Sequence, residues 1–270
     1  MLNKVTTLDY AHRWLRDGLQ ECGRAGAFEA IEADVTVASA AIRRLKSEGT
    51  PVTWTHIFVR AAAMALERNP ELHQLVAGNS RLHPSTVDIC LSLAGDSSVT
   101  PVLIIEDAAK KDLRAIAAEV KRRTPEATEE TRKMVDGLRR FGWLVPFSIL
   151  RRAFIRFLLR RSWYRRKVSG TFQVSCLAQV DLFAPFLFNT AAALGVGRVR
   201  DKVVAVNGQA VVRPTVTLSC CIDHAQWNGM AAAKFLTVIR EIVESGEFAE
   251  GMFASPAVPG LVCSALCDRL

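Results

Sequence analysis

The chain has 270 residues, of which 50% are hydrophobic, and a formal net charge of +8, so it can bury the core of one sizeable domain. Its first twenty residues lack the apolar segment of a secretory signal, which predicts a cytoplasmic protein. The seven cysteines are odd in number and none has C-x-x-C spacing, so we expect buried thiols, no disulfide framework and no metal site.

Strand and helix patterns alternate through the first half of the chain. Residues 27–37 alternate as a strand does, and 38–49 read as a helix that ends at Gly49. A second helix is predicted from a Thr53 cap to the break at 69–70. Two β-rich runs, 85–94 and 98–107, then precede a helix near 110–123.

Residues 138–167, LRRFGWLVPFSILRRAFIRFLLRRSWYRRK, are strongly basic. They hold ten Arg or Lys and no acidic residue, whereas the rest of the chain has 25 basic and 27 acidic residues. The whole positive excess therefore lies in one segment, which argues against nucleic acid as a general partner. Arginines also interrupt every apolar stretch before it reaches the ~18 residues of an ordinary transmembrane helix.

A helical wheel of this segment has two faces. The apolar face carries Leu150, Phe154, Phe157 and Leu158. The basic face carries Arg152, Arg156 and Arg160. Two interpretations stay open: a helix packed on the domain with its arginines solvated or paired, or a binding helix whose arginines contact anionic lipid, an acidic carrier protein or a phosphorylated cofactor.

The last hundred residues complete a mixed pattern. A strand is predicted over 171–177, a helix or loop over 182–197, and a hairpin over 201–214 with a type I′ turn at Asn207–Gly208. A strand over 215–223 and a helix over 229–246 follow, and residues 246–270 form a Pro/Gly-containing tail. We expect one mixed α/β domain over 1–270, with helices covering a mixed sheet.

Two side chains are candidates for chemistry. His224 follows a predicted strand and precedes a glycine turn, and imidazole is suited to general base catalysis near neutral pH. Ser175 lies in the strand 171–177, where its hydroxyl can donate to a developing oxyanion. A nucleophilic Ser175 with His224 as its base is the alternative, but no G-x-S-x-G elbow occurs. Nothing predicts a lowered pKa for the neighbouring Cys176.

The stretch DHAQWNGMAAAKFL, 223–236, resembles the D-H-x-x-x-D-G signature of the dihydrolipoamide acyltransferases of 2-oxoacid dehydrogenase complexes, whose catalytic domain is grouped with chloramphenicol acetyltransferase. Further blocks at 32–72, 100–121, 170–177 and 192–224 are similar to the family in the same order. The resemblance implies a chloramphenicol acetyltransferase-like two-layer α/β sandwich. It also implies a homotrimer with active sites between subunits.

The resemblance assigns roles to residues. His224 would be the general base, and Ser175 would hydrogen-bond the tetrahedral oxyanion. Asn228 stands where most relatives have an Asp that fixes the loop behind the histidine, and His73 where the family often has Asn. Coenzyme A would be the acyl carrier, with no metal involved.

The family's lipoyl domain, subunit-binding domain and Ala/Pro linker are absent from the sequence, and 138–167 would be an insertion. We therefore expect a stand-alone acyltransferase that moves an acyl group from a coenzyme A or acyl carrier protein thioester to a small or lipidic acceptor. It would be cytoplasmic or peripheral on the inner membrane surface. The alternative is a non-catalytic trimeric scaffold, or a protein that docks on a membrane or carrier and keeps the fold.

Overall fold

The computed structural model describes residues 9–22, 26–77, 80–93, 99–187, 190–224 and 226–250. A seven-stranded mixed sheet runs in the order β1-β9-β7-β6-β4-β5, with β8 paired to β9, and only β4, β6 and β7 are parallel. The strands are β1 (Gly26–Asp34), β4 (Ile89–Ser92), β5 (Val102–Ile105), β6 (Phe172–Cys176), β7 (Ala192–Val196), β8 (Arg200–Val206) and β9 (Gln209–Asp223). A separate ribbon pairs β2 (Leu75–Ala77) with β3 (Ser80–Leu82).

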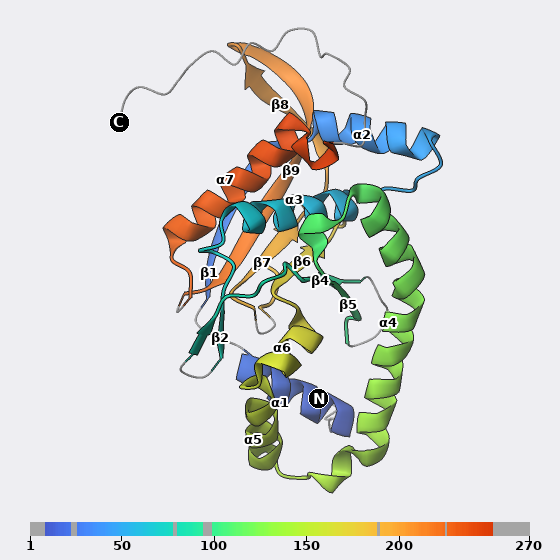
Figure 1. Cartoon of the computed structure of the whole chain (residues 1–270), viewed down its shortest axis with the longest axis vertical. Coiled ribbons are helices and arrows are strands. Elements are labelled where there is room, and N and C mark those ends of the chain that lie inside the picture. Colours follow the sequence, from blue (N-terminus) through green and yellow to red (C-terminus); the bar gives the residue numbers. More distant parts are fainter. Residues whose placement is uncertain are drawn as a thin grey trace, which may run out of the picture.

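Three helices cover one face of this sheet: α2 (Thr36–Ser47), α3 (Trp54–Arg68) and α7 (Gly229–Ser245) (Figure 1). Apolar residues of α3 and α7 form one core with the inward residues of the strands. On β9 these inward residues alternate, as the sequence pattern predicts, and are Val216, Leu218, Cys220 and Ile222. The prediction of a mixed α/β domain with helices over a mixed sheet is confirmed.

Local signals fix the ends of two elements as predicted. The Thr53 side chain and the His56 ring form a reciprocal cap at the start of α3, because the backbone N–H of Thr53 donates to His56 Nδ1 at 3.1 Å. In the β8–β9 turn, Asn207 and Gly208 have φ values of 51° and 78°. A type I′ turn requires this left-handed backbone at both central positions, and Asn-Gly adopts it readily.

The prediction of a helix or loop over 182–197 is wrong for its last part, because 192–196 form β7. β7 lies inside the sheet, between β6 and β9. All five of its residues are buried, so both of its faces are covered. A strand covered on both faces is continuously apolar, so the alternation that marks a half-exposed strand is missing. An alanine-rich run of this kind resembles a helix in sequence.

The helix expected near 110–123 is much longer than predicted. It is α4, which spans Leu113–Phe141 and continues through Pro125. The two strands before it are shorter than the β-rich runs that predicted them, and η1 (Ala108–Lys110) separates β5 from α4. Because α4 ends inside the basic segment, it carries the start of that segment away from the sheet (Figure 1).

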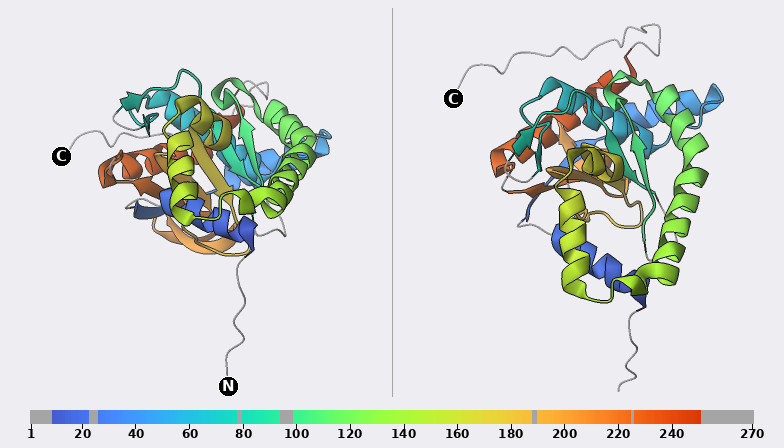
Figure 2. Two further views of the ribbon diagram at one scale, coloured as in Figure 1. Left: turned by 90° about the horizontal axis from the view of Figure 1, so that it is seen from below. Right: turned by 60° about the horizontal axis from the view of Figure 1, so that its bottom comes forward.

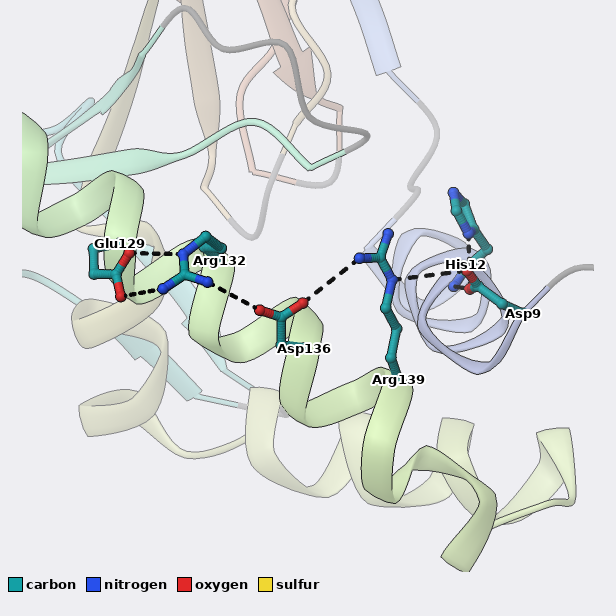
Figure 3. A network of polar contacts seen from close by, with 6 residues as sticks. All are labelled: Asp9, His12, Glu129, Arg132, Asp136 and Arg139. Atoms are coloured by element: carbon teal, nitrogen blue, oxygen red, sulfur yellow. Dashed lines mark hydrogen bonds and ion pairs between the residues drawn. The ribbon is translucent and has the colours of Figure 1, made fainter.

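A helical lobe lies at the opposite end of the long axis from the β8–β9 turn (Figure 1). It consists of the end of α4 together with α1 (Tyr10–Cys22), η2 (Gly142–Leu144), α5 (Ser148–Leu159) and α6 (Ser162–Ser169), as Figure 2 shows from below. We call these elements the lobe. Exposed ion pairs along α4 reach Asp9 beside α1, where Arg139 Nε lies 3.9 Å from Asp9 Oδ2 (Figure 3).

The side of α5 that faces the rest of the protein is not the apolar face of the helical wheel. Leu150, Phe154 and Phe157, expected on a packed or binding face, are exposed, whereas Arg151 is buried. Residues 246–250 of the predicted tail include η3 (Glu247–Ala249), whose Phe248 belongs to the core. The rest of that tail lies outside the described residues.

Candidate active site

His224 follows β9 directly, at the start of the loop that leads into α7. The residue is exposed, whereas Asp223 before it is buried. The backbone N–H of Asp223 donates to the carbonyl of Ala191 at 2.8 Å, which ties this end of β9 to the start of β7. The structure thus places His224 at a strand end, where the sequence pattern predicted it.

The loop after His224 folds back onto Asp223 through three hydrogen bonds. The backbone N–H groups of Gln226 and Trp227 donate to the Asp223 carbonyl at 2.8 and 3.0 Å. The Gln226 side chain donates to Asp223 Oδ2 at 2.7 Å, and both residues are buried. Breaking a buried polar contact leaves an unsatisfied group at a cost of about 1–3 kcal/mol, so this loop has a fixed shape.

Residues 72–74, which follow α3 in the chain, hold the same loop through two further hydrogen bonds. The indole Nε1 of Trp227 donates to the Leu72 carbonyl at 2.9 Å. The side chain of Gln74 donates to the Gln226 carbonyl at 3.0 Å. The loop that presents His224 is therefore clamped between the end of β9 and the residues after α3.

Trp227 also anchors the loop in the core. Its ring centroid lies 6.3 Å from that of Phe172 in β6 and 5.4 Å from that of Phe235 in α7. No motif in the sequence predicted Trp227, Gln226 or Gln74 as site residues. The available signal was a tryptophan three positions after the candidate histidine, because a large apolar ring in a short polar loop needs a buried place.

Asn228 begins α7. Its Oδ1 accepts a hydrogen bond from the backbone N–H of Ala231 at 2.9 Å, and its backbone is extended, with φ −99° and ψ 171°. Asn and Asp are equally good at this helix-capping position. The contact gives Asn228 a structural role, and the exchange of Asp for Asn keeps this role.

The structure does not bring Ser175 and His224 together within one chain. Ser175 in β6 pairs with Gly195 in β7, which pairs with Ser219 in β9, and His224 lies five residues beyond Ser219. At about 3.3 Å per residue along a strand and about 4.8 Å between strands, the two backbones are roughly 15–20 Å apart. One substrate carbonyl cannot contact both side chains of a single copy.

Other chemistry is not favoured by the described residues. Burial raises the pKa of the Cys176 thiol to about 12, which keeps it protonated and a poor nucleophile. Cys90, Cys176, Cys220 and Cys221 are free thiols. Within the described part of the chain, no three His, Cys, Asp or Glu side chains gather as metal ligands do.

The three arginines predicted to bind a substrate or carrier lie in the lobe. Arg152, Arg156 and Arg160 belong to α5 or follow it directly, and α5 packs against α1 and α6. Arg156 and Arg160 are exposed and Arg152 is half-buried. Their element is separate from the His224 loop, so the structure gives them no role in that loop's geometry.

His73 belongs to a buried network that fixes the start of β6. Its Nε2 lies 2.8 Å from Thr171 Oγ1, which also accepts a hydrogen bond from the Asp88 backbone N–H at 2.9 Å. Asp88 Oδ2 in turn accepts a hydrogen bond from Arg166 of α6 at 2.7 Å. Gly170 is required here, because it has φ 59° and a Cβ would lie 2.5 Å from the Asp88 carbonyl oxygen.

We expect His73 to make the fold sensitive to acid. Burial is the main cause that lowers the pKa of His73 from 6.5 to about 4, with Arg166 lowering it further and Asp88 opposing. The unfolded chain then binds more protons between these values, so the free energy of unfolding falls as the pH drops from about 7 towards 4, by up to about 3 kcal/mol. Urea unfolding at a series of pH values measures this slope.

The matched variants for this measurement are His73→Asn and His83→Asn. His73→Asn removes the titrating ring and keeps a polar partner for Thr171, so the pH slope should become shallower. His83 is exposed and makes the smallest of the contributions that lower the pKa of His73, so its replacement should change the slope far less than His73→Asn does. An unchanged slope in His73→Asn would show that another group is responsible, for example His56, whose pKa burial also lowers.

The chain is similar in sequence to a family of known proteins. Residues 19–137 and 168–250 match the family described as 2-oxoacid dehydrogenases acyltransferase (catalytic domain), and the match leaves out 138–167. The lipoamide acyltransferase component of the branched-chain alpha-keto acid dehydrogenase complex of Bacillus subtilis (strain 168) is 26% identical over 204 residues. The alignment covers 74% of this chain and 41% of the relative, so the chain spans less than half of that protein's length.

Two solved structures share the fold. The cubic core of the pyruvate dehydrogenase multienzyme complex aligns with a TM-score of 0.66 and 18% identity, over 91% of this chain and 93% of that one. The Azotobacter vinelandii dihydrolipoamide acetyltransferase aligns with a TM-score of 0.67 and 17% identity, also over 91% and 93%. The latter comes from a study of a serine, a histidine and an asparagine in the catalytic mechanism of that enzyme.

Proposed function

Because the chain belongs to the 2-oxoacid dehydrogenase acyltransferase (catalytic domain) family, we propose that it transfers an acyl group from a thioester to a nucleophilic acceptor. The observation that carries the proposal is the exposed His224, held at the end of β9 by the buried contacts of Asp223 and Gln226. In the A. vinelandii enzyme the studied asparagine comes four positions after the histidine, which is the spacing from His224 to Asn228.

His224 acts as general base in this proposal. Its imidazole takes the proton from the thiol, hydroxyl or amine of the acceptor as that atom attacks the carbonyl carbon of the thioester. The carbon–sulfur bond then breaks, and the leaving thiolate takes the proton from the imidazolium. The imidazole is restored, and the products are the acylated acceptor and a free thiol.

Ser175 stabilises the tetrahedral intermediate by donating a hydrogen bond from its hydroxyl to the oxyanion. One donor of this kind typically contributes a factor of ~10² to 10³ in turnover. Since the two residues lie far apart within one chain, we place the site between copies, with His224 from one and Ser175 from the next. A homotrimer has three such sites. The alignment with the cubic core of a multienzyme complex supports assembly into an oligomer.

The donor in this proposal is a thioester of coenzyme A or of acyl carrier protein, and the acceptor is a small or lipidic molecule. The thioester supplies an activated carbonyl and a thiol leaving group. The acceptor supplies an attacking atom with a proton to lose. The B. subtilis relative is named for lipoamide, so a dihydrolipoyl thiol belongs among the acceptors to be tried.

The test is thiol release from a panel of acyl-coenzyme A and acyl carrier protein thioesters, with purified wild-type chain, His224→Ala and the exposed-histidine control His83→Ala. We expect acceptor-dependent release by wild type and by His83→Ala, and a loss of it in His224→Ala. Absence of release from the whole panel, or equal release in His224→Ala, would instead support the non-catalytic scaffold.

A further inference from the structure

The lobe exposes a concentrated apolar surface. Nine of the nineteen large hydrophobic side chains that are exposed among the described residues lie between 141 and 163, each between 51% and 81% exposed. They are Phe141, Trp143, Leu144, Phe147, Ile149, Leu150, Phe154, Phe157 and Trp163. We call them the lobe surface. Exposed apolar side chains that gather in one part of a domain indicate a contact with a partner or a membrane, whereas scattered single ones do not.

The outward orientation of α5 is fixed by a buried arginine. Arg151 is 2% exposed, and its Nε donates to Oδ2 of the fully buried Asp17 of α1 at 2.7 Å. Its Nη1 donates to the carbonyls of Val145 and Pro146 at 2.9 and 2.7 Å. Because these bonds hold the Arg151 side of α5 against α1, the opposite side faces solvent and carries Ile149.

Positive charge lies beside the lobe surface. The segment 138–167 carries ten Arg or Lys and no acidic residue. Arg151 and Arg165 are buried, and Arg139 and Arg166 form ion pairs with acidic residues outside the segment, so the charge beside the surface is smaller than this count. Two other arginines of the segment lie over rings of the surface itself: Arg161 is 4.7 Å from the centroid of Phe157, and Arg140 is 5.2 Å from that of Phe141. A partner must therefore offer both apolar contact and negative charge.

We propose that the lobe surface docks on an anionic lipid bilayer and lies in its headgroup region. Such an interface accepts aromatic side chains at the acyl boundary and guanidinium groups at the phosphates, which matches the arrangement here. None of the helices among the described residues has the length and apolar character of a membrane-spanning segment. An acidic carrier protein would complement the positive charge, but binding to it would not require nine exposed apolar side chains.

The position of the lobe suits this contact. It forms one end of the molecule's long axis, so a flat membrane can meet α5 and η2 without meeting the sheet (Figures 1 and 2). The proposal goes beyond the acyltransferase activity and does not depend on it. It would hold equally for a chain that catalyses nothing.

The experiment is sedimentation of the whole chain with vesicles of phosphatidylcholine alone or with 30% phosphatidylglycerol. Wild type should bind the anionic vesicles and not the neutral ones. Arg156→Gln/Arg160→Gln should lower the partition coefficient by about 30-fold, at about fivefold per arginine. Phe147→Ser/Ile149→Ser, at the two most exposed apolar positions of the surface, should lower it by at least about tenfold.

Matched controls lie at the other end of the molecule. Arg43→Gln/Lys46→Gln removes the same charge from exposed positions of α2, and Val203→Ser/Val212→Ser removes exposed apolar side chains from the β8–β9 hairpin. Both should bind as wild type does. Circular dichroism of each variant checks that it is folded.

Three outcomes would overturn the proposal. The first is no binding to anionic vesicles. The second is equal binding by wild type and by both lobe variants. The third is a different partner for the surface: saturable binding to an acidic carrier protein without vesicle binding, or an oligomer that dissociates in Phe147→Ser/Ile149→Ser while vesicles are ignored.

Discussion

Co-assembled His224→Ala and Ser175→Ala chains should recover about a third of the wild-type turnover, although each variant alone is nearly inactive. The reason is the distance between the two residues within one chain, which places His224 of one copy opposite Ser175 of the next in the proposed site. In every trimer that contains both variants, about one site in three draws its histidine from a Ser175→Ala chain and its serine from a His224→Ala chain. Alone, His224→Ala should lose ~10² to 10⁴ in turnover and Ser175→Ala ~10² to 10³.

The measurement uses two affinity tags, one on each variant, so that only mixed oligomers are assayed for thiol release. A matched control pairs His224→Ala with the double variant His224→Ala/Ser175→Ala, which can form no complete site and should stay inactive. Inactive mixed oligomers would contradict a site shared between copies. Full activity of Ser175→Ala by itself would remove Ser175 from the mechanism.

Short sequence patterns correctly predicted the elements that are determined by residues close together in the chain. The alternation along β9, the Thr53 cap of α3 and the Asn207–Gly208 turn are all observed. The pattern failed at β7, where burial on both faces removes alternation, and at α4, which continues past Pro125. In both cases packing decides the element, and packing is not visible in a short window of sequence.

The candidate site was predictable in part for the same reason. A histidine at a strand end is a local feature, and His224 lies there. Its distance from Ser175 depends on the register of three strands, which no local pattern contains. The clamp that Gln74 and Trp227 provide joins residues about 150 positions apart, so a sequence window cannot show it.

The basic segment shows how one long-range pair sets which side of a helix faces the domain. The helical wheel separates apolar and basic residues of α5, but it cannot tell which residue faces the domain. The structure turns Arg151 inward, towards Asp17, 134 positions earlier in the chain. The apolar side chains that α5 contributes to the lobe surface are exposed as a consequence.

Replacement of Arg151 by methionine should therefore be among the most destabilising single changes in the lobe. It leaves the Asp17 carboxylate buried without its charged partner, and removes the donor to the carbonyls of Val145 and Pro146. Breaking a buried ion pair on one side costs about 3–5 kcal/mol. Urea unfolding followed by circular dichroism measures the loss in the whole chain, and hydrogen exchange in α1 and α5 shows whether the lobe opens first.

Two further variants separate the ion pair from general damage to a helix. Arg132→Met removes an exposed arginine that pairs with Glu129 on α4 (Figure 3), and it should leave the free energy of unfolding nearly unchanged. Asp17→Leu/Arg151→Met removes both buried charges, so it should regain part of the stability that Arg151→Met loses, with the two carbonyls still unpaired. If Arg151→Met has the same free energy of unfolding as Arg132→Met, the buried pair does not hold α5 in place. The exposure of the lobe surface must then have another cause.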